Sequence, residues 1–208
     1  MKKIIFDLDN TLLFISSDWS DSYQAFIDKY NLDITPQDLF SKIGCFERDL
    51  SGVVNENDLC NYINNKLNLN ITYDMVLDFL SRYENIPLRD TDMIYDVLEY
   101  LSNKYELIAY TNWFTNIQTG RLKNYNLDKF FSRIYGWDIL PMKPSEEGIR
   151  SIIGNDDIND YIMIGDNIKI DLEVPHSMGM DTILYNRKGI EQNIYKEIVN
   201  ISELKNIL

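Results

Sequence analysis

The chain has little cysteine, little positive charge and no long hydrophobic run, and each shortage argues against a class of protein. Among its 208 residues only Cys45 and Cys60 are cysteines, which is too few for a disulfide framework and shows no zinc-ligand spacing. We expect both to be small apolar core residues in a reducing, cytoplasmic setting. No stretch is long and apolar enough to span a bilayer. Asp7 ends the N-terminal apolar run too early for a secretion signal.

Basic residues are outnumbered, with 20 Lys and Arg against 33 Asp and Glu and a formal net charge of −13 at pH 7. Nonspecific nucleic-acid binding and binding to anionic membranes both need a basic surface. We therefore expect no nucleic acid and no membrane as partners. An anionic substrate would need local cations in its site. Composition does not predict the oligomeric state.

The order of the predicted elements separates the two ends of the chain from a helical middle. An apolar strand is predicted over residues 2–8, and residues 18–85 have a helical periodicity that predicts about four helices. From residue 90 onward helices and strands alternate, and short helices end the chain. The later strands are predicted over residues 106–111, 133–137, 161–165 and 182–185. This alternation predicts an α/β fold in which helices cover both faces of a parallel sheet.

Two carboxylates follow the first predicted strand. Asp7 and Asp9 are two positions apart, and a β-strand would place both side chains on one face and close together. Neighbouring anions repel each other, so the pair predicts either a bound metal or divided acid and base roles. A solvated turn is the plain alternative. A calcium loop of the EF-hand type is excluded because Leu12 occupies its glycine position.

Polar residues also follow three later strands. Thr111 and Asn112 follow the second strand, Lys143 lies beyond the third, and Asp166 and Asp171 follow the fourth. Ligands of an open parallel sheet bind outside the carboxyl ends of its strands, so these residues are expected in one crevice. Carboxylates suit Mg²⁺, while a hydroxyl and a lysine could bind an anion beside the metal. The combination suits phosphoryl transfer.

These segments resemble, in order, the four motifs of the haloacid dehalogenase superfamily. The matching segments are Asp7-Leu8-Asp9-Asn10-Thr11-Leu12, Thr111, Lys143-Pro144 and Gly165-Asp166-Asn167-Ile168-Lys169-Ile170-Asp171. The resemblance covers the whole chain and implies a Rossmann-like, doubly wound parallel sheet with an inserted all-helical cap domain of the C1 type. It divides the chain into a catalytic core of residues 1–14 and 89–208 and a cap of residues 15–88. In this family such caps close over the site and choose the substrate.

The resemblance implies a role for the first aspartates of these motifs. Asp7 matches the nucleophile that forms an aspartyl-phosphate. Asp9 matches the acid and base that protonates the leaving oxygen and later activates water. Asp7, the backbone carbonyl of Asp9, and Asp166 match the ligands of Mg²⁺.

The remaining matches concern the phosphate and its surroundings. Thr111 and Lys143 match the phosphate-binding side chains, and Asn112 would offer its backbone amide. Asp171 matches a carboxylate that orients Lys143. Asn167, like Asp171, is expected to support the residues that bind the phosphate and the metal. Capping of the following helix is an equal alternative for Asp171.

Asp9 also separates two branches of the family. Dehalogenases of the superfamily usually lack an acid two residues after the nucleophile, because a halide needs no proton. The presence of Asp9 favours a Mg-dependent phosphatase that acts on a small phosphorylated metabolite. The alternatives are a phosphomutase or other phosphotransferase of the same superfamily, and a catalytically silent binding or regulatory member.

The sequence does not name the substrate. In the insertion, Arg48 is a candidate for reaching a substrate anion, with a surface salt bridge as the alternative. The aromatic residues Trp19, Tyr23 and Phe26 are expected in the core of the insertion rather than in a substrate site. Trp113 is bulky for a position near a phosphate pocket and is expected to narrow it.

Overall fold

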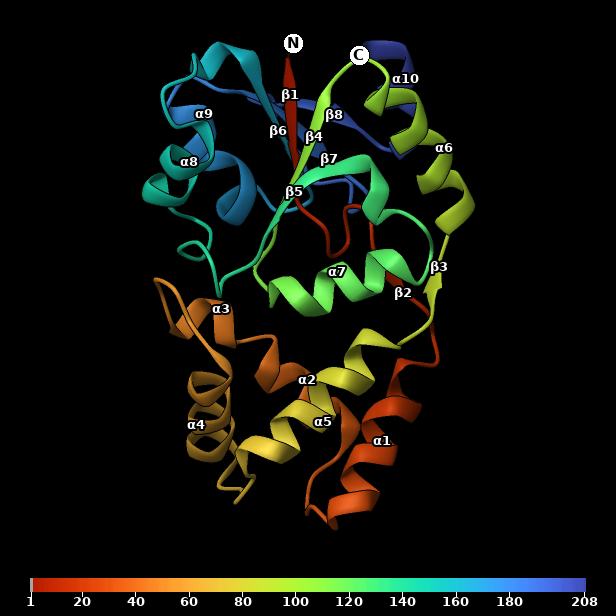
Figure 1. Cartoon of the computed structure of the whole chain (residues 1–208), viewed down its shortest axis with the longest axis vertical. Helices are drawn as coiled ribbons and strands as arrows, with labels where there is room; N and C mark the ends of the chain where they lie inside the picture. The colour runs from red at the N-terminus through yellow and green to blue at the C-terminus, as the bar shows by residue number, and fades with distance from the viewer. Residues whose placement is uncertain (1) are drawn as a thin grey trace.

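A six-stranded sheet forms the centre of the computed structural model, which describes residues 2–208 apart from the side chain of Glu47 (Figure 1). Its strands are β1 (Lys3–Phe6), β4 (Glu106–Tyr110), β5 (Phe131–Tyr135), β6 (Tyr161–Gly165), β7 (Asp181–Tyr185) and β8 (Lys196–Ile198). Their order across the sheet is β5-β4-β1-β6-β7-β8, and neighbouring strands are parallel. The predicted α/β fold is confirmed.

Helices cover both faces of this sheet, because successive strand residues point to opposite sides. Ile4 of β1 belongs to the apolar cluster that includes helices α6 (Thr91–Ser102) and α10 (Leu204–Ile207). Ile5 belongs to a different cluster, formed with helix α8 (Glu146–Ile153). Strands buried on both faces carry continuous apolar stretches, as β6 does. The doubly wound arrangement is therefore confirmed.

Two segments near the C-terminus differ from the prediction. Strand β8 was not predicted, because it has only three residues and two of them are exposed, so no apolar run marks it. The helix expected between the predicted strands 161–165 and 182–185 is a π-helical segment over Ile168–Leu172, continued by α9 (Glu173–Ser177). Pro175 lies within α9 and has no N–H to donate to the preceding turn.

The insertion is helical and lies beyond the carboxyl ends of the strands (Figure 1). Its helices are α1 (Trp19–Tyr30), α2 (Pro36–Ile43), α3 (Phe46–Asp49), α4 (Glu56–Leu67) and α5 (Tyr73–Glu84). The side chains of Thr35, Asn55 and Thr72 cap α2, α4 and α5 by accepting hydrogen bonds from backbone N–H groups of the first turn. Helix α3 was not predicted, since four residues are too few to show a helical period.

The apolar core of the insertion continues into loops of the sheet-containing part. Tyr23 and Phe26 are buried in it, as predicted, and Trp19 packs against it. Trp113 and Trp137, which follow β4 and β5, belong to the same cluster. The insertion therefore rests on the strand ends through aromatic side chains.

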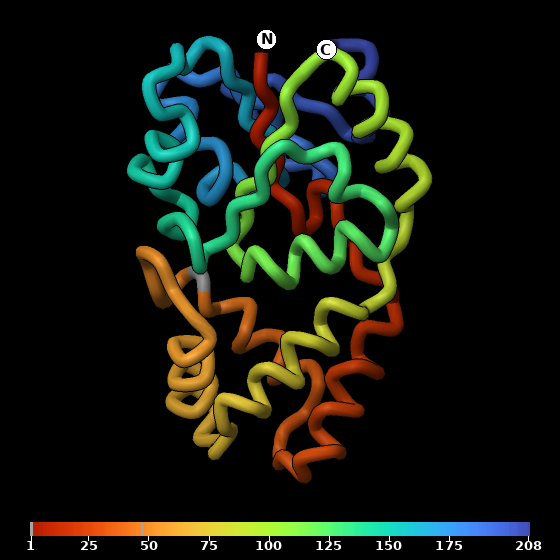
Figure 2. Tube along the Cα trace, in the orientation of Figure 1, coloured from red at the N-terminus to blue at the C-terminus, as the bar shows by residue number. Residues whose placement is uncertain are grey.

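The two ends of the insertion pair with each other. Strand β2 (Phe14–Ile15) is antiparallel to β3 (Leu88–Arg89), with Phe14 opposite Arg89 and Ile15 opposite Leu88. Figure 2 shows the chain leaving the sheet in red and returning in yellow on the same side of the molecule. The predicted domain boundaries, residues 1–14 and 89–208 for the core and 15–88 for the cap, stay a prediction.

Helix α7 (Thr115–Lys123) lies between the sheet and the insertion and contacts α5 (Figure 1). Its buried face carries Ile117 and Leu122 but also the polar side chains of Gln118 and Arg121. Buried polar groups in folded proteins are nearly always hydrogen-bonded. The partners of these two side chains belong to the site described below.

Both cysteines are free thiols. Cys60 is buried as predicted, whereas Cys45 is half-buried. In the part of the chain that the structure describes, no helix has the length and apolar character needed to cross a membrane.

Candidate active site

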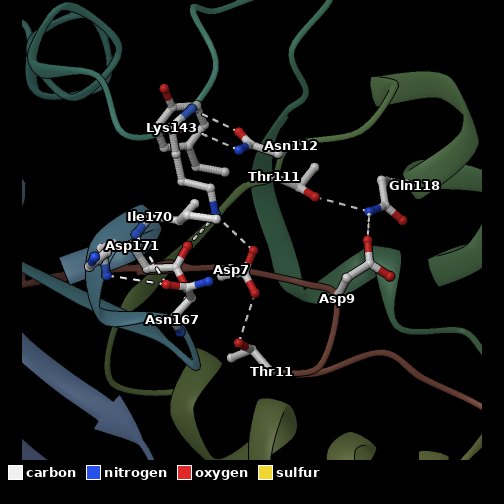
Figure 3. Close-up of polar contacts among 12 residues, drawn as sticks. Asp7, Asp9, Thr11, Thr111, Asn112, Gln118, Lys143, Asn167, Ile170 and Asp171 are labelled. Carbon is white, nitrogen blue, oxygen red and sulfur yellow. Dashed lines mark hydrogen bonds and ion pairs between the residues drawn. The ribbon is translucent and has the colours of Figure 1, made fainter. Parts of the chain in front are cut away.

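Side chains from several separate segments meet at the carboxyl edge of the sheet (Figure 3). Asp7 follows β1, Thr111 follows β4, Asp166 follows β6, and Lys143 precedes α8. They line a pocket of about 150 Å³, here called the catalytic pocket. Its lining residues are Asp7, Asp9, Asn10, Thr111, Asn112, Lys143, Asp166, Asn167, Ile170, Asp171 and Lys188. Every site residue predicted from the motifs is among them.

Asp7 and Lys143 form a buried ion pair at the centre of this pocket. Lys143 Nζ donates to Asp7 Oδ1 and to Asp171 Oδ1, at 2.7 Å in each case. Thr11 Oγ1 donates to the other oxygen of Asp7 at 2.8 Å. Asp7, Lys143 and Asp171 are respectively 7, 3 and 2% exposed. One ammonium group thus lies between two carboxylates that have little contact with water.

The electrostatics of this triad follow from its burial. Burial raises the pKa of Asp7; Lys143 opposes that shift, and the charge of Asp171 adds to it. Burial alone would lower the pKa of Lys143, but the carboxylates of Asp171 and Asp7 outweigh this and raise it. Lys143 is therefore held in its charged form, and the site has an excess of negative charge.

Carboxylates gather in the same pocket closely enough to hold a cation. Oxygens of Asp7, Asp166 and Asp171 all lie within 4.8 Å of one another. Burial also raises the pKa of Asp166, Lys188 opposes that shift, and the charge of Asp171 adds to it. Carboxylate oxygens are the donors that Mg²⁺ prefers, so the donor set fits this metal.

Asp166 has a partner that the sequence did not indicate. Lys188 Nζ donates to Asp166 Oδ2 at 3.0 Å, and the Lys188 side chain is 66% exposed. An exposed lysine can swing away at little cost, because surface ion pairs contribute only about 0–1 kcal/mol. The contact therefore does not block a metal at Asp166.

Asp171 is fixed by its own backbone environment. The N–H of Asn167 donates to Asp171 Oδ2 at 3.0 Å. The Asn167 side chain in turn accepts from the N–H groups of Lys169 and Ile170 and so starts the π-helical segment. A Cβ at Gly165 would lie 2.4 Å from Asp171 Oδ2, so only glycine allows this close approach. The predicted pairing of Asp171 with Lys143 is present.

Asn112 holds the backbone of Lys143. Its Oδ1 accepts from the N–H of Lys143 at 2.7 Å, and its Nδ2 donates to the carbonyl oxygen of Lys143 at 2.8 Å. The resemblance had assigned only the backbone amide of Asn112 to the site. Its side chain therefore has a further task, which is to fix the loop that delivers the lysine.

The carboxylate of Asp9 is bound by helix α7 rather than by the groups around Asp7 (Figure 3). Gln118 Nε2 donates to Asp9 Oδ2 at 2.6 Å and to Thr111 Oγ1 at 2.9 Å, and Arg121 Nη1 donates to Asp9 Oδ1 at 2.7 Å. Strand β1 was predicted to reach Leu8 but ends at Phe6. The strand alternation from which Asp7 and Asp9 were expected to lie side by side therefore does not extend to Asp9.

Arg121 was missed by sequence reasoning, and so was Gln118. The Arg121 side chain is fully buried, and the Asp9 side chain that it binds is 33% exposed. Burial alone would lower the pKa of Arg121, but Asp9 more than compensates and raises it. The guanidinium also lies 4.8 Å from the ring centroid of Tyr83 in α5, a cation–π contact. In the sequence, the only indication of this pair is that the polar residues Gln118 and Arg121 are three positions apart in the helix that follows Thr111.

A second pocket, here called the aromatic pocket, adjoins the first and has a volume of about 160 Å³. It is lined by Asp9, Tyr23, Phe40, Ile43, Gly44, Tyr83, Asn112, Trp113 and Trp137. Trp113 was expected to narrow the phosphate pocket, but it lines this neighbouring space instead. Arg48 is exposed, donates to Cys45 Sγ and lines neither pocket.

A parallel α/β sheet, a helical insertion after its first strand, and an Asp-x-Asp segment facing a buried lysine together define a hydrolase of the haloacid dehalogenase type. The sequence model of the haloacid dehalogenase-like hydrolases matches residues 4–185. The chain belongs to this family.

One curated relative matches part of the chain. Pyrimidine 5'-nucleotidase PynA of Streptococcus pneumoniae is 33% identical over 104 residues, a match that covers 48% of this chain and 44% of that protein. The chain is thus aligned with less than half of the length of this relative.

Solved structures share the whole architecture. The HAD-hydrolase YfnB of Bacillus subtilis, in a magnesium-bound form, superposes with a TM-score of 0.78 and 18% identity, over 99% of this chain and 97% of that one. A 2-haloacid dehalogenase of Pseudomonas syringae pv. Tomato DC3000 gives a TM-score of 0.69 and 16% identity, over 100% and 98% of the two chains. At these identities the likeness extends to the fold alone, and it includes both hydrolases and dehalogenases.

Proposed function

We propose that the protein is a Mg²⁺-dependent phosphatase that hydrolyses a small-molecule phosphate monoester through an aspartyl-phosphate on Asp7. The observation that carries the proposal is the buried contact of Asp7 with Lys143, in a pocket that is also lined by Asp9 and Asp166. A nucleophile, a cation and a second acid are then within reach of one phosphate group. Burying both members of an ion pair costs desolvation even when they are paired, which argues for a functional role.

In the first half-reaction a carboxylate oxygen of Asp7 attacks phosphorus as the ester P–O bond breaks. Asp9 gives its proton to the departing oxygen, which leaves as an alcohol. In the second half-reaction Asp9 takes a proton from water, the water oxygen attacks phosphorus, and Asp7 departs as a carboxylate. Over the two half-reactions Asp9 loses one proton and regains one, and Asp7 gains the phosphoryl group and loses it, so both side chains end as they began.

The other residues hold the phosphate and its charge. Lys143 faces Asp7 and would neutralise the oxygens of the transferring group, while Thr111 would bind one of them from the opposite side. Mg²⁺, held by Asp7, Asp166 and the backbone carbonyl of Asp9, would supply further positive charge against those oxygens. The remaining lone pairs of the Asp9 carboxylate are available for the proton, because Gln118 and Arg121 each occupy only one.

Asp9 favours phosphate over halide as the leaving group. A departing halide needs no proton, whereas an alkoxide does. Asp9 lines both pockets, so a group leaving the catalytic pocket toward the aromatic pocket passes its carboxylate. The name of the streptococcal relative suggests nucleoside 5'-monophosphates as the first substrates to test.

The test is hydrolysis of p-nitrophenyl phosphate with release of inorganic phosphate. We expect EDTA to stop the reaction and added Mg²⁺ to restore it. Asp7→Asn should lower kcat by about a thousand-fold or more, because the nucleophile is lost. Asp33→Asn, at an exposed position of the insertion, is the matched control and should keep full activity. Full turnover by Asp7→Asn would refute the proposal, and phosphate transfer to a second hydroxyl without release would identify a phosphomutase.

A further inference from the structure

The aromatic pocket is built by both parts of the molecule. Tyr23, Phe40 and Tyr83 come from helices of the insertion, whereas Trp113 and Trp137 come from loops after β4 and β5. A ligand there would contact both parts at once. Because Asp9 and Asn112 line this pocket as well as the catalytic one, a single substrate could occupy both.

The rings of this pocket contact one another in tilted and edge-to-face pairs. The ring centroid of Trp113 lies 4.9 Å from that of Tyr83 and 4.8 Å from that of Trp137, and the centroids of Tyr23 and Phe40 lie 5.8 Å apart. Aromatic side chains bind flat ligands through stacking and edge-to-face contacts, which tolerate different ring identities. A flat aromatic group gains more from such a lining than a flexible aliphatic one.

The charge of the lining restricts the ligand further. Among the described residues that line the aromatic pocket, none is Lys or Arg, and Asp9 is the charged one. The catalytic pocket, in contrast, contains Lys143 and Lys188. A leaving group with a carboxylate or a second phosphate would bring its charge close to Asp9, and the nearby Arg121 is already paired with Asp9, so the lining offers that charge no cation of its own, which is unfavourable.

Two buried donors in the lining have no protein partner. The indole N–H groups of Trp113 and Trp137 make no hydrogen bond within the described part of the chain. An unpaired buried donor costs free energy, and an acceptor on a bound ligand would recover it. Both nitrogens are covered by protein atoms in this state, so an acceptor reaches them only when the neighbouring rings move. These donors favour a ring that carries carbonyl or ring-nitrogen acceptors.

From these observations we propose that the aromatic pocket binds an uncharged, planar heteroaromatic leaving group, of the kind found in a nucleoside, while the phosphate lies between Asp7 and Lys143. The inference rests on the proposed phosphatase function and adds the substrate class. The plain alternative is that the rings only seal the insertion against the strand ends. If that alternative is correct, kcat/KM should not depend on whether the substrate carries a base.

Gly44 offers a way to fill the pocket without removing a ring. It lines the pocket and has a φ of −63° and a ψ of −10°, a conformation open to any residue. A Cβ there would meet its nearest atoms at 3.4 and 3.6 Å, which is ordinary contact. Gly44→Leu should therefore fold, and it adds a bulky side chain at a position that lines the pocket. Lys42→Leu adds the same side chain at an exposed position of the same helix and is the matched control.

The experiment compares uridine 5'-monophosphate with ribose 5-phosphate, which is the same sugar phosphate without a base. We expect the wild-type protein to prefer the nucleotide in kcat/KM by about ten-fold or more, the range that stacking of one base provides. In Gly44→Leu the ratio should fall to about one, and in Lys42→Leu it should remain as in wild type. 2-Phosphoglycolate, with its second negative charge, should be the poorest substrate. Equal kcat/KM for nucleotide and sugar phosphate, or an unchanged ratio in folded Gly44→Leu, would overturn the inference.

A binding measurement separates this inference from the phosphatase function. Two of the three tryptophans line the pocket, so free uridine should quench the intrinsic fluorescence, and ribose should not. Hydrolysis of acetyl phosphate, which has no ring, reports the catalytic chemistry alone. Acetyl phosphate turnover without uridine quenching contradicts the pocket assignment and leaves the phosphatase intact. Uridine quenching without any phosphate release contradicts the phosphatase and leaves the pocket assignment intact.

Discussion

The two adjoining pockets are built by opposite means. The catalytic pocket is lined mostly by charged and polar side chains, of which Asp7, Thr111 and Asp166 directly follow strand ends, and its central Asp7 and Lys143 are almost fully buried. About half of the residues that line the aromatic pocket come from helices of the insertion, whereas Trp113 and Trp137 follow β4 and β5. The sheet therefore fixes the chemistry, while the insertion supplies surface that can vary without disturbing it.

Asp9 is where the two regions meet. It lines both pockets, and Arg121 connects it to Tyr83 in the insertion. If the two regions have separate tasks, variants in the catalytic pocket should lower turnover of every substrate. Variants in the aromatic pocket should instead change the ratio between substrates. Each prediction below tests this separation.

The largest effect is expected from Lys143→Met, which leaves Asp7 and Asp171 buried without their cation. Removing one partner of a buried ion pair costs about 3–5 kcal/mol, so the free energy of unfolding in EDTA should fall by that order. We expect kcat/KM to fall by about a thousand-fold for uridine 5'-monophosphate and ribose 5-phosphate alike. Urea unfolding and initial rates measure the two effects.

Lys196→Met is the control for this variant, because Lys196 is exposed on the edge strand β8. It should keep both stability and activity. A Lys143→Met protein that lost activity toward only one of the two substrates would break the comparison, since the lysine would then act on the leaving group and not on the phosphate.

The same contrast explains what the sequence could predict. Strands β4 and β6 were predicted at nearly their observed bounds, because a strand buried on both faces shows as a continuous apolar run. Asp7 and Asp166 could be placed because each directly follows such a strand, so the backbone itself carries them to one edge.

The residues that were missed depend on tertiary contacts. Gln118 and Arg121 lie on the buried face of α7, where a sequence pattern predicts apolar side chains. These two polar side chains can be buried because both donate hydrogen bonds to the Asp9 carboxylate, a tertiary contact that the sequence does not show. The aromatic pocket was missed for a similar reason: Tyr23 was correctly predicted as a core residue, yet it also lines the pocket where that core meets the strand ends.

A smaller effect, selective for the leaving group, is expected from Asp9→Asn. General acid and base catalysis typically contributes about 100-fold or more, and we expect kcat for a nucleoside monophosphate to fall by about 100-fold. Acetyl phosphate has a leaving group that needs no proton, so its first half-reaction should be much less affected. The phosphorylated form of Asp7 should then accumulate, which rapid-quench mass spectrometry of the intact protein would detect. Equal loss of the first half-reaction for both substrates would contradict the role of Asp9 as the acid.

The smallest of these effects is expected from Arg121→Met, because Arg121 acts only through Asp9. The Asp9 side chain is 33% exposed, so water can replace the lost guanidinium, and Gln118 still holds the other oxygen. Misplacing a catalytic group by about 1 Å costs up to about 100-fold, and we expect a loss of that order or less in kcat with little change in KM.

The ratio between substrates makes this last variant informative. Arg121 contacts Tyr83, which lines the aromatic pocket, so a purely structural role would loosen that pocket and reduce the preference for uridine 5'-monophosphate over ribose 5-phosphate. A positioning role for Asp9 instead lowers kcat for both and leaves their ratio unchanged, and Arg121→Lys, which keeps the charge, should recover part of the rate. A collapsed ratio with normal kcat would mean that Arg121 serves the aromatic pocket, and the two regions would then be coupled through Tyr83 and not through Asp9.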